Sequence, residues 1–300
     1  MAKLSASERR PPLWTRMFTQ HQVTQVLRQG MFYLVLLALS LFILAPLGWM
    51  LTAALKPDTA PVFTFPPEWF PTRYWRWETF REALFSPAMP FGRFAFNTLL
   101  LVALNEVGTL LSVALVAYPF ARLRFRGRRT LFTLLIVTML IPGPVLLIPQ
   151  FLLFHRLGWV GTYLPLWVPS FTANAFYVFL VRQYMRSIPR DLDEAARIDG
   201  AGYGAIWMRI ILPLSAPALA VVAVFTFLGV WNDFLGPLIY LNDQDKYTVA
   251  LALATLNRRI GTEWNVLMAA NLVAMLPPLL VYFLAQRQLI GGIASVGLKG

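Results

Sequence analysis

The sequence predicts an all-α integral membrane protein with six transmembrane helices and both termini in the cytoplasm. Of its 300 residues, 58% are hydrophobic and only 13% are charged, and the mean hydropathy is +0.60. Soluble domains carry about 25% charged residues, so this composition excludes a soluble fold. The apolar residues form runs long enough to cross a hydrocarbon core of about 30 Å, and Lys and Arg gather in alternate loops between these runs.

The first apolar run covers residues 31–53 and follows a tail, residues 1–30, that is rich in Lys and Arg. The run is too long for the apolar region of a signal peptide, and it lacks a small-residue cleavage site. Pro46 within it is tolerated in a packed membrane bundle. We therefore expect this run to remain as the first span.

A polar segment rich in Pro and Trp, residues 54–93, separates the first span from the second. Tryptophan is enriched at membrane–water interfaces, so part of this segment is expected to lie on the membrane surface. The second span is expected at residues 94–121. An arginine cluster without an acid follows it directly: Arg122, Arg124, Arg126, Arg128 and Arg129.

The third and fourth spans are expected at residues 130–153 and 161–184. The third contains Pro142, Pro144 and Pro149. Proline removes a helical hydrogen bond and is the usual cause of a bend, so these residues predict helix kinks.

The fifth span is expected to begin near Pro213 and to reach Leu241. Polar residues interrupt it at Trp231-Asn232-Asp233, where we expect a break in the helix near the outer face. The sixth span is expected at residues 267–286. The membrane domain would then cover residues 31–290, with a cytoplasmic tail at 291–300.

The distribution of Lys and Arg assigns the two sides of the membrane. Seventeen of the 26 lie in the two termini and in the loops at 122–129 and 182–209, and nine lie in the other loops. Cytoplasmic loops carry an excess of Lys and Arg, so both termini and the loop at 185–213 are expected in the cytoplasm. This distribution also explains the net charge of +12, and nucleic acid is not expected as a partner.

Several classes of chemistry are absent from the sequence. It has no cysteine, and its two histidines, His21 and His155, are far apart and have no ligand-spaced partner. Neither G-x-x-x-x-G-K-[ST] nor G-x-G-x-x-G occurs, and the same holds for H-E-x-x-H and G-x-S-x-G. We therefore expect no catalytic residue, metal or cofactor in this chain. If it works with ATP, another chain must supply the ATPase.

Residues 191–213, DLDEAARIDGAGYGAIWMRIILP, form the longest charged and small-residue segment of the chain. Asp191 is expected to act as the N-cap of a short helix, with Glu194 completing a capping box. Asp193 and Arg197 have the spacing of a helical ion pair. Gly200 and a second glycine, Gly202, would end the helix, because glycine adopts positive φ without strain.

This segment also resembles a family signature. Glu194-Ala195-Ala196, followed after three residues by Gly200 and later by Ile210 and Leu212-Pro213, is similar to the EAA motif of the membrane permeases of bacterial ABC importers. The alternative is an ordinary amphipathic turn in a cytoplasmic loop. Further stretches resemble the MalG-type permeases of carbohydrate importers, at residues 141–170, 179–201, 231–241 and 284–300.

The resemblance implies a MetI-like bundle in the inner membrane that imports a sugar, with an oligosaccharide favoured. It also implies three kinds of partner besides the membrane lipid: a second, related permease subunit, two ATPase subunits and an extracytoplasmic sugar-binding protein. The coupling element for the ATPase would include Glu194, Ala195, Ala196, Asp199 and Gly200. The loop before the last span would contact the binding protein through Leu256, Asn257, Arg258 and Arg259.

Polar residues inside the spans are costly in a bilayer, so they mark a substrate pathway or bind one another. The candidates for a pathway are Asn105, Glu106, Asn174, Asn232, Asp233 and Asn271, and Asn97 is a further polar residue of this kind. Neutral amides suit a carbohydrate better than an ion. The alternative is that they hold helices together, because Asn often forms hydrogen bonds between helices in membranes. Asn105-Glu106 departs from the family, in which small or apolar residues are expected.

Three other functions remain open at this point. The EAA motif is shared by importers of amino acids, phosphate and polyamines, so the solute could be one of these. An ion-coupled secondary transporter would need internal repeats and paired ionisable residues in its spans, whereas the spans contain one clear mid-span acid. A membrane enzyme would need a nucleophile or metal constellation, which the sequence lacks.

Overall fold

The computed structural model describes residues 13–57, 62, 69–70, 75–86, 90–259 and 264–297, and within these ranges the regular structure is entirely helical. Four helical stretches are long and apolar enough to cross a membrane without interruption: Thr24–Ala54, Phe91–Arg122, Leu164–Ser187 and Trp264–Gln288. Two bent pairs complete the set, Arg128–Thr138 with Gly143–Arg156 and Tyr203–Leu214 with Ala216–Trp231. With each pair counted as one span, the structure has the six predicted spans.

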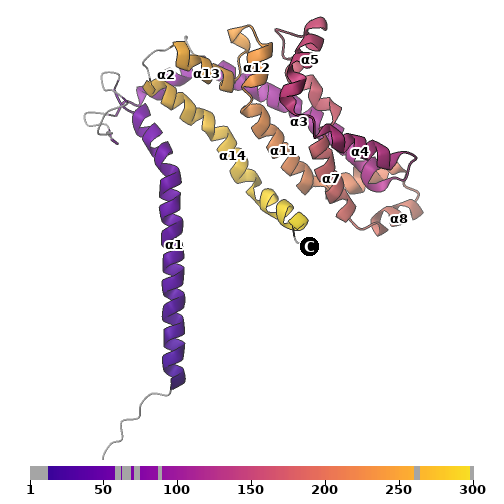
Figure 1. The fold of residues 1–300 in the computed structure, drawn as a ribbon, viewed down its shortest axis with the longest axis horizontal. Coiled ribbons are helices and arrows are strands. Elements are labelled where there is room, and N and C mark those ends of the chain that lie inside the picture. The colour runs from indigo at the N-terminus through magenta and orange to yellow at the C-terminus, as the bar shows by residue number, and fades with distance from the viewer. Residues whose placement is uncertain are drawn as a thin grey trace, which may run out of the picture.

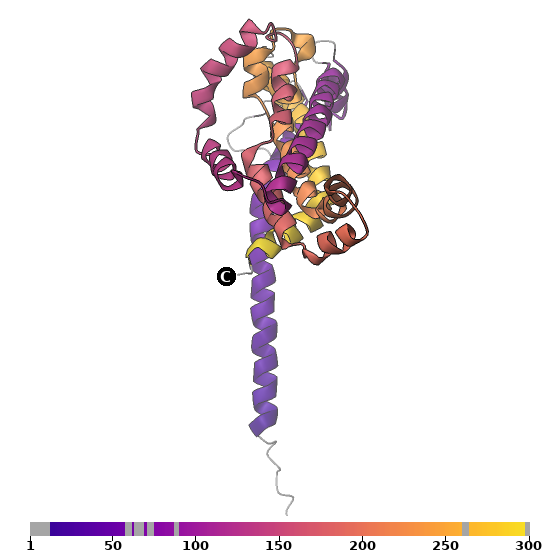
Figure 2. The same cartoon turned by 90° about the vertical axis from the view of Figure 1, so that its right-hand side faces the viewer.

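Helix α1, Leu13–Ala54, extends away from the rest of the chain (Figures 1 and 2). The most apolar window of its span is 0% buried within the chain. Among the side chains of α1 that the structure describes, the fully buried ones lie at its end, where Ala53 and Ala54 are beside α14, Trp264–Gly297. The helix begins inside the expected tail at 1–30 because no proline interrupts it between Pro12 and Pro46.

Helix α3, Phe91–Arg122, is the central element of the bundle. It packs against α7, Ala175–Ser187, against α11, Ala216–Trp231, and against the 3₁₀ turn η1, Val168–Thr172. Its buried face contains many small residues, which allow neighbouring backbones to approach closely: Gly108, Ser112, Ala114, Ala117 and Ala121.

The third span turns sharply instead of kinking. Helices α4, Arg128–Thr138, and α5, Gly143–Arg156, meet at an angle of 95°. Pro142 is the N-cap of α5, and Pro144 lies in its first turn, where a missing N–H costs nothing. The prediction of kinks was therefore wrong for these two prolines, which start a new helix, while α5 continues through Pro149.

The fourth span is assembled from three pieces. Helix α6, Leu164–Trp167, continues as η1 and then as α7. Ala173 between them has φ of 58°, a left-handed conformation that is uncommon for a residue other than glycine. Asn174 then caps α7, because its side chain accepts hydrogen bonds from the backbone N–H groups of Phe176 and Tyr177.

The fifth span follows a segment of short helices that is expected to lie in the cytoplasm. These are α8, Asp191–Ile198; α9, Tyr203–Ile206; the π turn η2, Trp207–Ile211; and α10, Leu212–Leu214. The chain then bends by 71° at Ser215 and enters α11. Helix α11 ends at Trp231, and α12, Leu235–Tyr240, begins after Asn232 and Asp233, so the predicted break is confirmed.

The segments at the end of the bundle opposite α8 are more helical than the sequence predicted. They contain α2, Glu78–Phe85, the 3₁₀ turn η3, Gln244–Lys246, and α13, Val249–Arg259. Figure 1 shows α2, α12 and α13 at one end of the bundle, and α8 and the C-terminal end of α14 toward the opposite end. Helix α14 runs to Gly297, well past the expected end of the sixth span.

Gly108 offers a test of the packing around α3. A Cβ atom at this position would meet Ser170 Oγ and would lie 2.6 Å from Phe171 Cδ2. Overpacking of this kind costs about 1–3 kcal/mol, so Gly108→Ala should lower the thermal unfolding midpoint of the purified protein. The control is Gly92→Ala on the same helix, where a Cβ atom has nothing within 4 Å. Equal midpoints for the two variants would contradict this view of α3.

Candidate functional site

Helix α8 begins one residue earlier than the sequence indicated. The carbonyl oxygen of Arg190 accepts the first helical hydrogen bonds, from the N–H groups of Asp193 and Glu194, at 2.9 and 3.1 Å. Arg190 is therefore the N-cap and no side chain caps the helix, so the predicted Asp191 cap and its capping box were wrong. Asp191, Asp193 and Glu194 lie in the first turn instead, where the helix dipole favours acids.

The end of α8 is a Schellman motif. Gly200 has φ of 82°, its N–H donates to the Arg197 carbonyl at 3.0 Å, and the Ala201 N–H donates to the Ala196 carbonyl at 2.9 Å. This reversed pair of bonds requires a left-handed residue, for which glycine is best suited. Gly202 has φ of −75° and does not have the predicted left-handed conformation.

One side of α8 is buried against the bundle through Asp193 and Ala196. Asp193 lies 3.6 Å from Arg122 Nη1, and both side chains are almost fully buried. Arg122 Nη2 also donates to the Ile188 carbonyl at 2.9 Å. The C-terminal end of α3 therefore holds both the start of α8 and the turn before it. The sequence had indicated a local Asp193–Arg197 pair, but the structure gives Asp193 a partner on another helix.

The opposite side of α8 faces away from the chain. Glu194, Ala195, Asp199 and Gly200 are exposed, and Ile198 is 86% exposed. Of the five predicted coupling residues, only Ala196 is buried, and it belongs to an apolar cluster that also contains Val181 and Met185 of α7. The structure thus leaves the other four exposed at this end of the bundle.

A cavity of about 390 Å³ lies between α8 and the end of α3. Arg197 stacks over the ring of Tyr203 in its wall, with 5.0 Å between Cζ and the ring centroid. Among the described residues, Arg122 Nε and Asp193 Oδ1 have no hydrogen-bond partner. The polar residues that line this cavity are Arg122, Arg124, Arg190, Asp193, Glu194, Arg197 and Tyr203.

A second cavity, of about 280 Å³, lies between α3, η1, α7 and α11 and is open at the surface of the chain. We call it the inner cavity. It brings together two of the predicted pathway residues, Asn105 and Asn174. None of the described residues that line it is charged. The polar groups of its lining come from Asn105, Thr109, Ser170, Thr172, Asn174, Tyr177 and Thr226.

The two asparagines of this inner cavity also hold the backbone in place. Asn105 Nδ2 donates to the Leu101 carbonyl at 2.8 Å and to the Leu166 carbonyl at 3.0 Å. Asn174 caps α7. Glu106 follows Asn105 in α3, and its Oε2 is buried without a hydrogen-bond partner among the described residues. The hydroxyl groups of the lining were not predicted, because Ser and Thr are common where membrane helices pack together and so do not by themselves indicate a pathway.

The other three predicted pathway residues lie elsewhere. Asn232 and Asn271 each donate to the carbonyl four residues earlier in their own helix, both at 2.8 Å. Asp233 Oδ1 accepts a hydrogen bond from the Gly236 N–H and so stabilises the turn between α11 and α12. None of these three lines the inner cavity.

The four residues predicted to contact a binding protein lie in the last turns of α13, so the expected loop is helical there. The side chains of Leu256, Asn257, Arg258 and Arg259 lie outside the described part of the structure.

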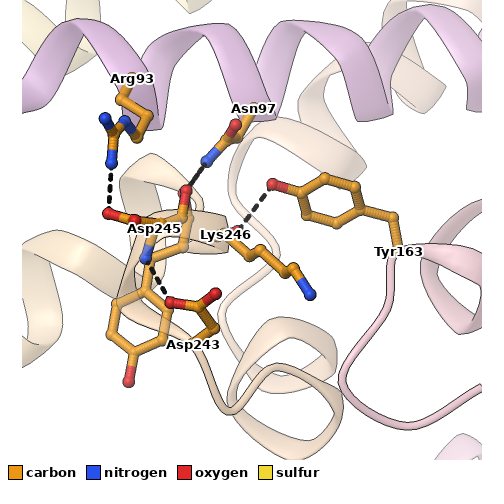
Figure 3. A network of polar contacts seen from close by, with 7 residues as sticks. Arg93, Asn97, Tyr163, Asp243, Asp245 and Lys246 are labelled. Carbon is orange, nitrogen blue, oxygen red and sulfur yellow. Dashed lines mark hydrogen bonds and ion pairs between the residues drawn. The ribbon is translucent and has the colours of Figure 1, made fainter.

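A polar network fixes the segment that leads into α13 (Figure 3). Asn97 of α3 is buried, and its Nδ2 donates to the carbonyls of Asp245 and Tyr247 at 2.8 and 3.0 Å. Arg93 pairs with the Asp245 carboxylate at the surface. Tyr163 Oη donates to the Lys246 carbonyl at 3.1 Å. No pattern in the sequence links residues so far apart.

The buried ion pair of α8 gives a stability prediction. Asp193→Leu leaves the buried Arg122 charge without its carboxylate, which costs about 3–5 kcal/mol, so the thermal unfolding midpoint should fall. Arg122→Met combined with Asp193→Leu should recover most of the loss, because an apolar pair of similar volume avoids the desolvation of both charges. A double variant that is no more stable than Asp193→Leu would show that the pair is not coupled.

Comparison with known proteins places this architecture in a family. Residues 108–294 match the family model described as "Binding-protein-dependent transport system inner membrane component". The arabinooligosaccharide transport permease AraQ of Halalkalibacterium halodurans is 34% identical over 76% of this chain and 75% of its own length. The galactooligosaccharide transport permease GanQ of Bacillus subtilis is 31% identical over 95% of this chain and 100% of its own length.

A solved structure has the same fold. It belongs to a bacterial ABC transporter involved in the import of the acidic polysaccharide alginate, and its chain superposes with a TM-score of 0.72 at 22% identity over 96% of this chain and 99% of its own. The six-span helical architecture and the family match agree. The chain therefore belongs to the binding-protein-dependent transport system inner membrane components, as the multi-pass permease subunit of an ABC importer.

Proposed function

We propose that this permease imports a sugar, and specifically an oligosaccharide. The observation that carries the proposal is the inner cavity, whose lining offers hydroxyl and amide groups with no charge among the described residues. Neutral donors and acceptors match the hydroxyl groups of a carbohydrate. The similarity to permeases for arabinooligosaccharides and galactooligosaccharides supports the same substrate class.

The lining favours a sugar over the other solutes considered. Amino acids, phosphate and polyamines carry charges, and a buried charge needs a paired group to offset its desolvation. Glu106 follows the lining residue Asn105 in the chain but does not belong to the lining itself. A cation such as a polyamine would need the Glu106 carboxylate to point into the pathway. The substrate screen described below includes spermidine and so tests this alternative.

Helix α8 is the proposed docking element for the ATPase, through Glu194, Ala195, Asp199 and Gly200, with Ala196 holding the helix on the bundle. Helix α8 also exposes the large apolar side chain of Ile198, which a docked subunit would cover. One coupling helix per permease subunit predicts two ATPase subunits for a pair of permeases.

The exposed helix α1 supports a second, related permease subunit as partner. A helix whose apolar window is 0% buried within its own chain must be covered by lipid, by another protein, or by both. A pathway between two subunits also explains why the inner cavity is open at the surface of this chain. The binding protein is assigned to the opposite end, where α13 carries Leu256, Asn257, Arg258 and Arg259.

The experiment that tests the sugar proposal uses the complete importer in lipid nanodiscs with its binding protein. ATP hydrolysis is measured after the binding protein has been loaded from a panel of oligosaccharides, monosaccharides, amino acids, phosphate and spermidine. Stimulation by oligosaccharides alone is the expected result. Stimulation by any charged solute and by no sugar would overturn the proposal.

Gly229 gives a prediction for the pathway. It lines the inner cavity, and a Cβ atom there has nothing within 4 Å, so Gly229→Leu should fill space without a clash inside this chain. Removal of a glycine from a helix also favours folding by up to about 1 kcal/mol. We expect normal expression and assembly but at least about ten-fold slower uptake of labelled sugar. The same change at Gly92, away from the cavity, should leave uptake unaltered.

Glu194 gives a prediction for coupling. Glu194→Lys places a cation on the exposed side of α8, so the ATPase subunits should be lost on purification or should no longer respond to substrate. The control is Glu78→Lys, since Glu78 is also an exposed first-turn acid of an eight-residue helix, but at the opposite end of the bundle. Both variants lose the same favourable interaction with a helix dipole. ATPase subunits that remain bound and fully responsive in Glu194→Lys would refute the docking role.

A further inference from the structure

The outer end of α3 holds the segment that leads into α13. The two N–H bonds of the Asn97 amide go to the backbone carbonyls of Asp245 and Tyr247. The neighbouring Thr98 is fully buried, and its Oγ1 accepts a hydrogen bond of 3.0 Å from the Val249 N–H, the first residue of α13. A free N–H at a helix start is thus satisfied from a different helix. We call Asn97 and Thr98 the outer clamp.

The inner end of the same helix holds α8. Arg122, its last residue, donates to the Ile188 carbonyl and pairs with Asp193. We call Arg122 and Asp193 the inner clamp. Around 25 residues separate the two clamps, which is about 37 Å at a rise of 1.5 Å per residue, and α3 is one continuous helix over that distance.

Two separate apolar clusters pack on α3, one near each clamp. One cluster joins Phe91 and Phe94 of α3 to Val249 and Ala252 of α13. The other cluster joins Val113 and Ala117 of α3 to Ala196 of α8. It also includes Ile206 of α9 and Ile211 of η2, which follow α8 in the chain. Helix α11 also enters both clusters, but α3 supplies hydrogen bonds both to the α13 segment and to the turn before α8. Tyr163 adds one further bond to the α13 segment.

The middle of α3 is attached to the fourth span. Asn105 donates to the Leu166 carbonyl, and Ser112 Oγ donates to the Ser170 carbonyl at 3.0 Å. Gly108 lets this segment approach so closely that no Cβ atom would fit between them. Residues 164–172 are therefore expected to move together with α3 as one body.

We propose that α3 links the two docking ends of the subunit, so that contact of the binding protein with α13 is transmitted to α8 through the outer clamp, the continuous helix α3 and the inner clamp. Asn97, Thr98, Arg122 and Asp193 are then positioning residues. The proposal rests on the proposed function, which assigns α13 to the binding protein and α8 to the ATPase. A shared helix alone does not establish coupling, so the test must break one end and observe the other.

The test uses the complete importer in nanodiscs, with binding protein carrying the oligosaccharide that stimulates ATP hydrolysis most in the screen above. Two variants open the outer clamp. Thr98→Val keeps the side-chain shape but removes the acceptor for the Val249 N–H, and Asn97→Leu removes both amide donors. The measured quantities are the binding-protein concentration for half-maximal stimulation, the maximal ATPase rate, and hydrogen exchange of the α8 backbone amides.

In the unaltered complex, saturating loaded binding protein should change the exchange of the α8 amides. In the two variants this change should disappear, and the stimulation of ATP hydrolysis should fall about five-fold per lost hydrogen bond. The basal ATPase rate and the co-purification of all subunits should stay unchanged. The control is Arg93→Gln, which removes an exposed ion pair with the same segment; such pairs contribute little, and the full response should remain.

A covalent clamp separates transmission from a general loss of structure. The chain has no cysteine, so the variant with Asn97→Cys and Tyr247→Cys can be joined by a short bifunctional thiol reagent after assembly. The α8 response should be weak before this treatment and should recover after it, in the same preparation.

The outcomes separate the inference from the function on which it rests. If α8 responds normally in Thr98→Val and Asn97→Leu at saturating binding protein, transmission through α3 is wrong while the docking roles stand. The same conclusion follows if the crosslink does not restore a weakened response. If neither α8 nor the ATPase rate responds in the unaltered complex, the docking roles fail and the inference fails with them.

Discussion

The bundle depends on α3 satisfying backbone carbonyls that belong to other segments. Side chains of Asn97, Asn105, Ser112 and Arg122 each donate to a carbonyl of a distant part of the chain. A hydrocarbon core offers no water to an unpaired carbonyl, so irregular backbone is tolerated only where protein satisfies it. The broken fourth span and the turn before α8 exist next to α3 because that helix supplies the donors.

This constraint explains why polar residues of the spans have two roles. Asn105 was a candidate for the pathway, with interhelical hydrogen bonding as the alternative. Its amide group bonds to Leu101 and Leu166, and the same residue lines the inner cavity. The backbone interaction joins α3 to α6 and fixes the position of Asn105 in the cavity wall. Contact of this wall with a solute is part of the proposed function.

The sequence was sufficient for the spans and insufficient for their irregularities. Hydropathy and length locate six spans because both depend on composition alone. Pro142 and Pro144 start a helix after a 95° turn instead of kinking one, a choice that depends on what lies beside the turn. Helix α13 was expected as a loop, because a helix of 11 residues is stabilised mainly by packing, here on α3 and α14.

The site was predictable to the extent that its contacts are local. Gly200 follows from the rule for helix ends, and its positive φ is as expected. The Asp191 cap was wrong because the Arg190 carbonyl already accepts the first helical bonds. Asp193 and Arg197 have the spacing of a helical pair, yet burial beside α3 gives Asp193 the Arg122 partner. Only the fold brings that arginine to α8.

The uncovered length of α1 has a consequence for how the subunit exists before assembly. In water, a bare apolar helix of 31 residues would drive aggregation, but lipid tails solvate it as well as a protein surface does. The newly inserted subunit can therefore wait in the bilayer as a monomer, without a hydrophobic penalty on α1. Its choice of partner is then decided by close packing and by hydrogen bonds between helices, because lipid covers the apolar surface of α1 as well as a partner would.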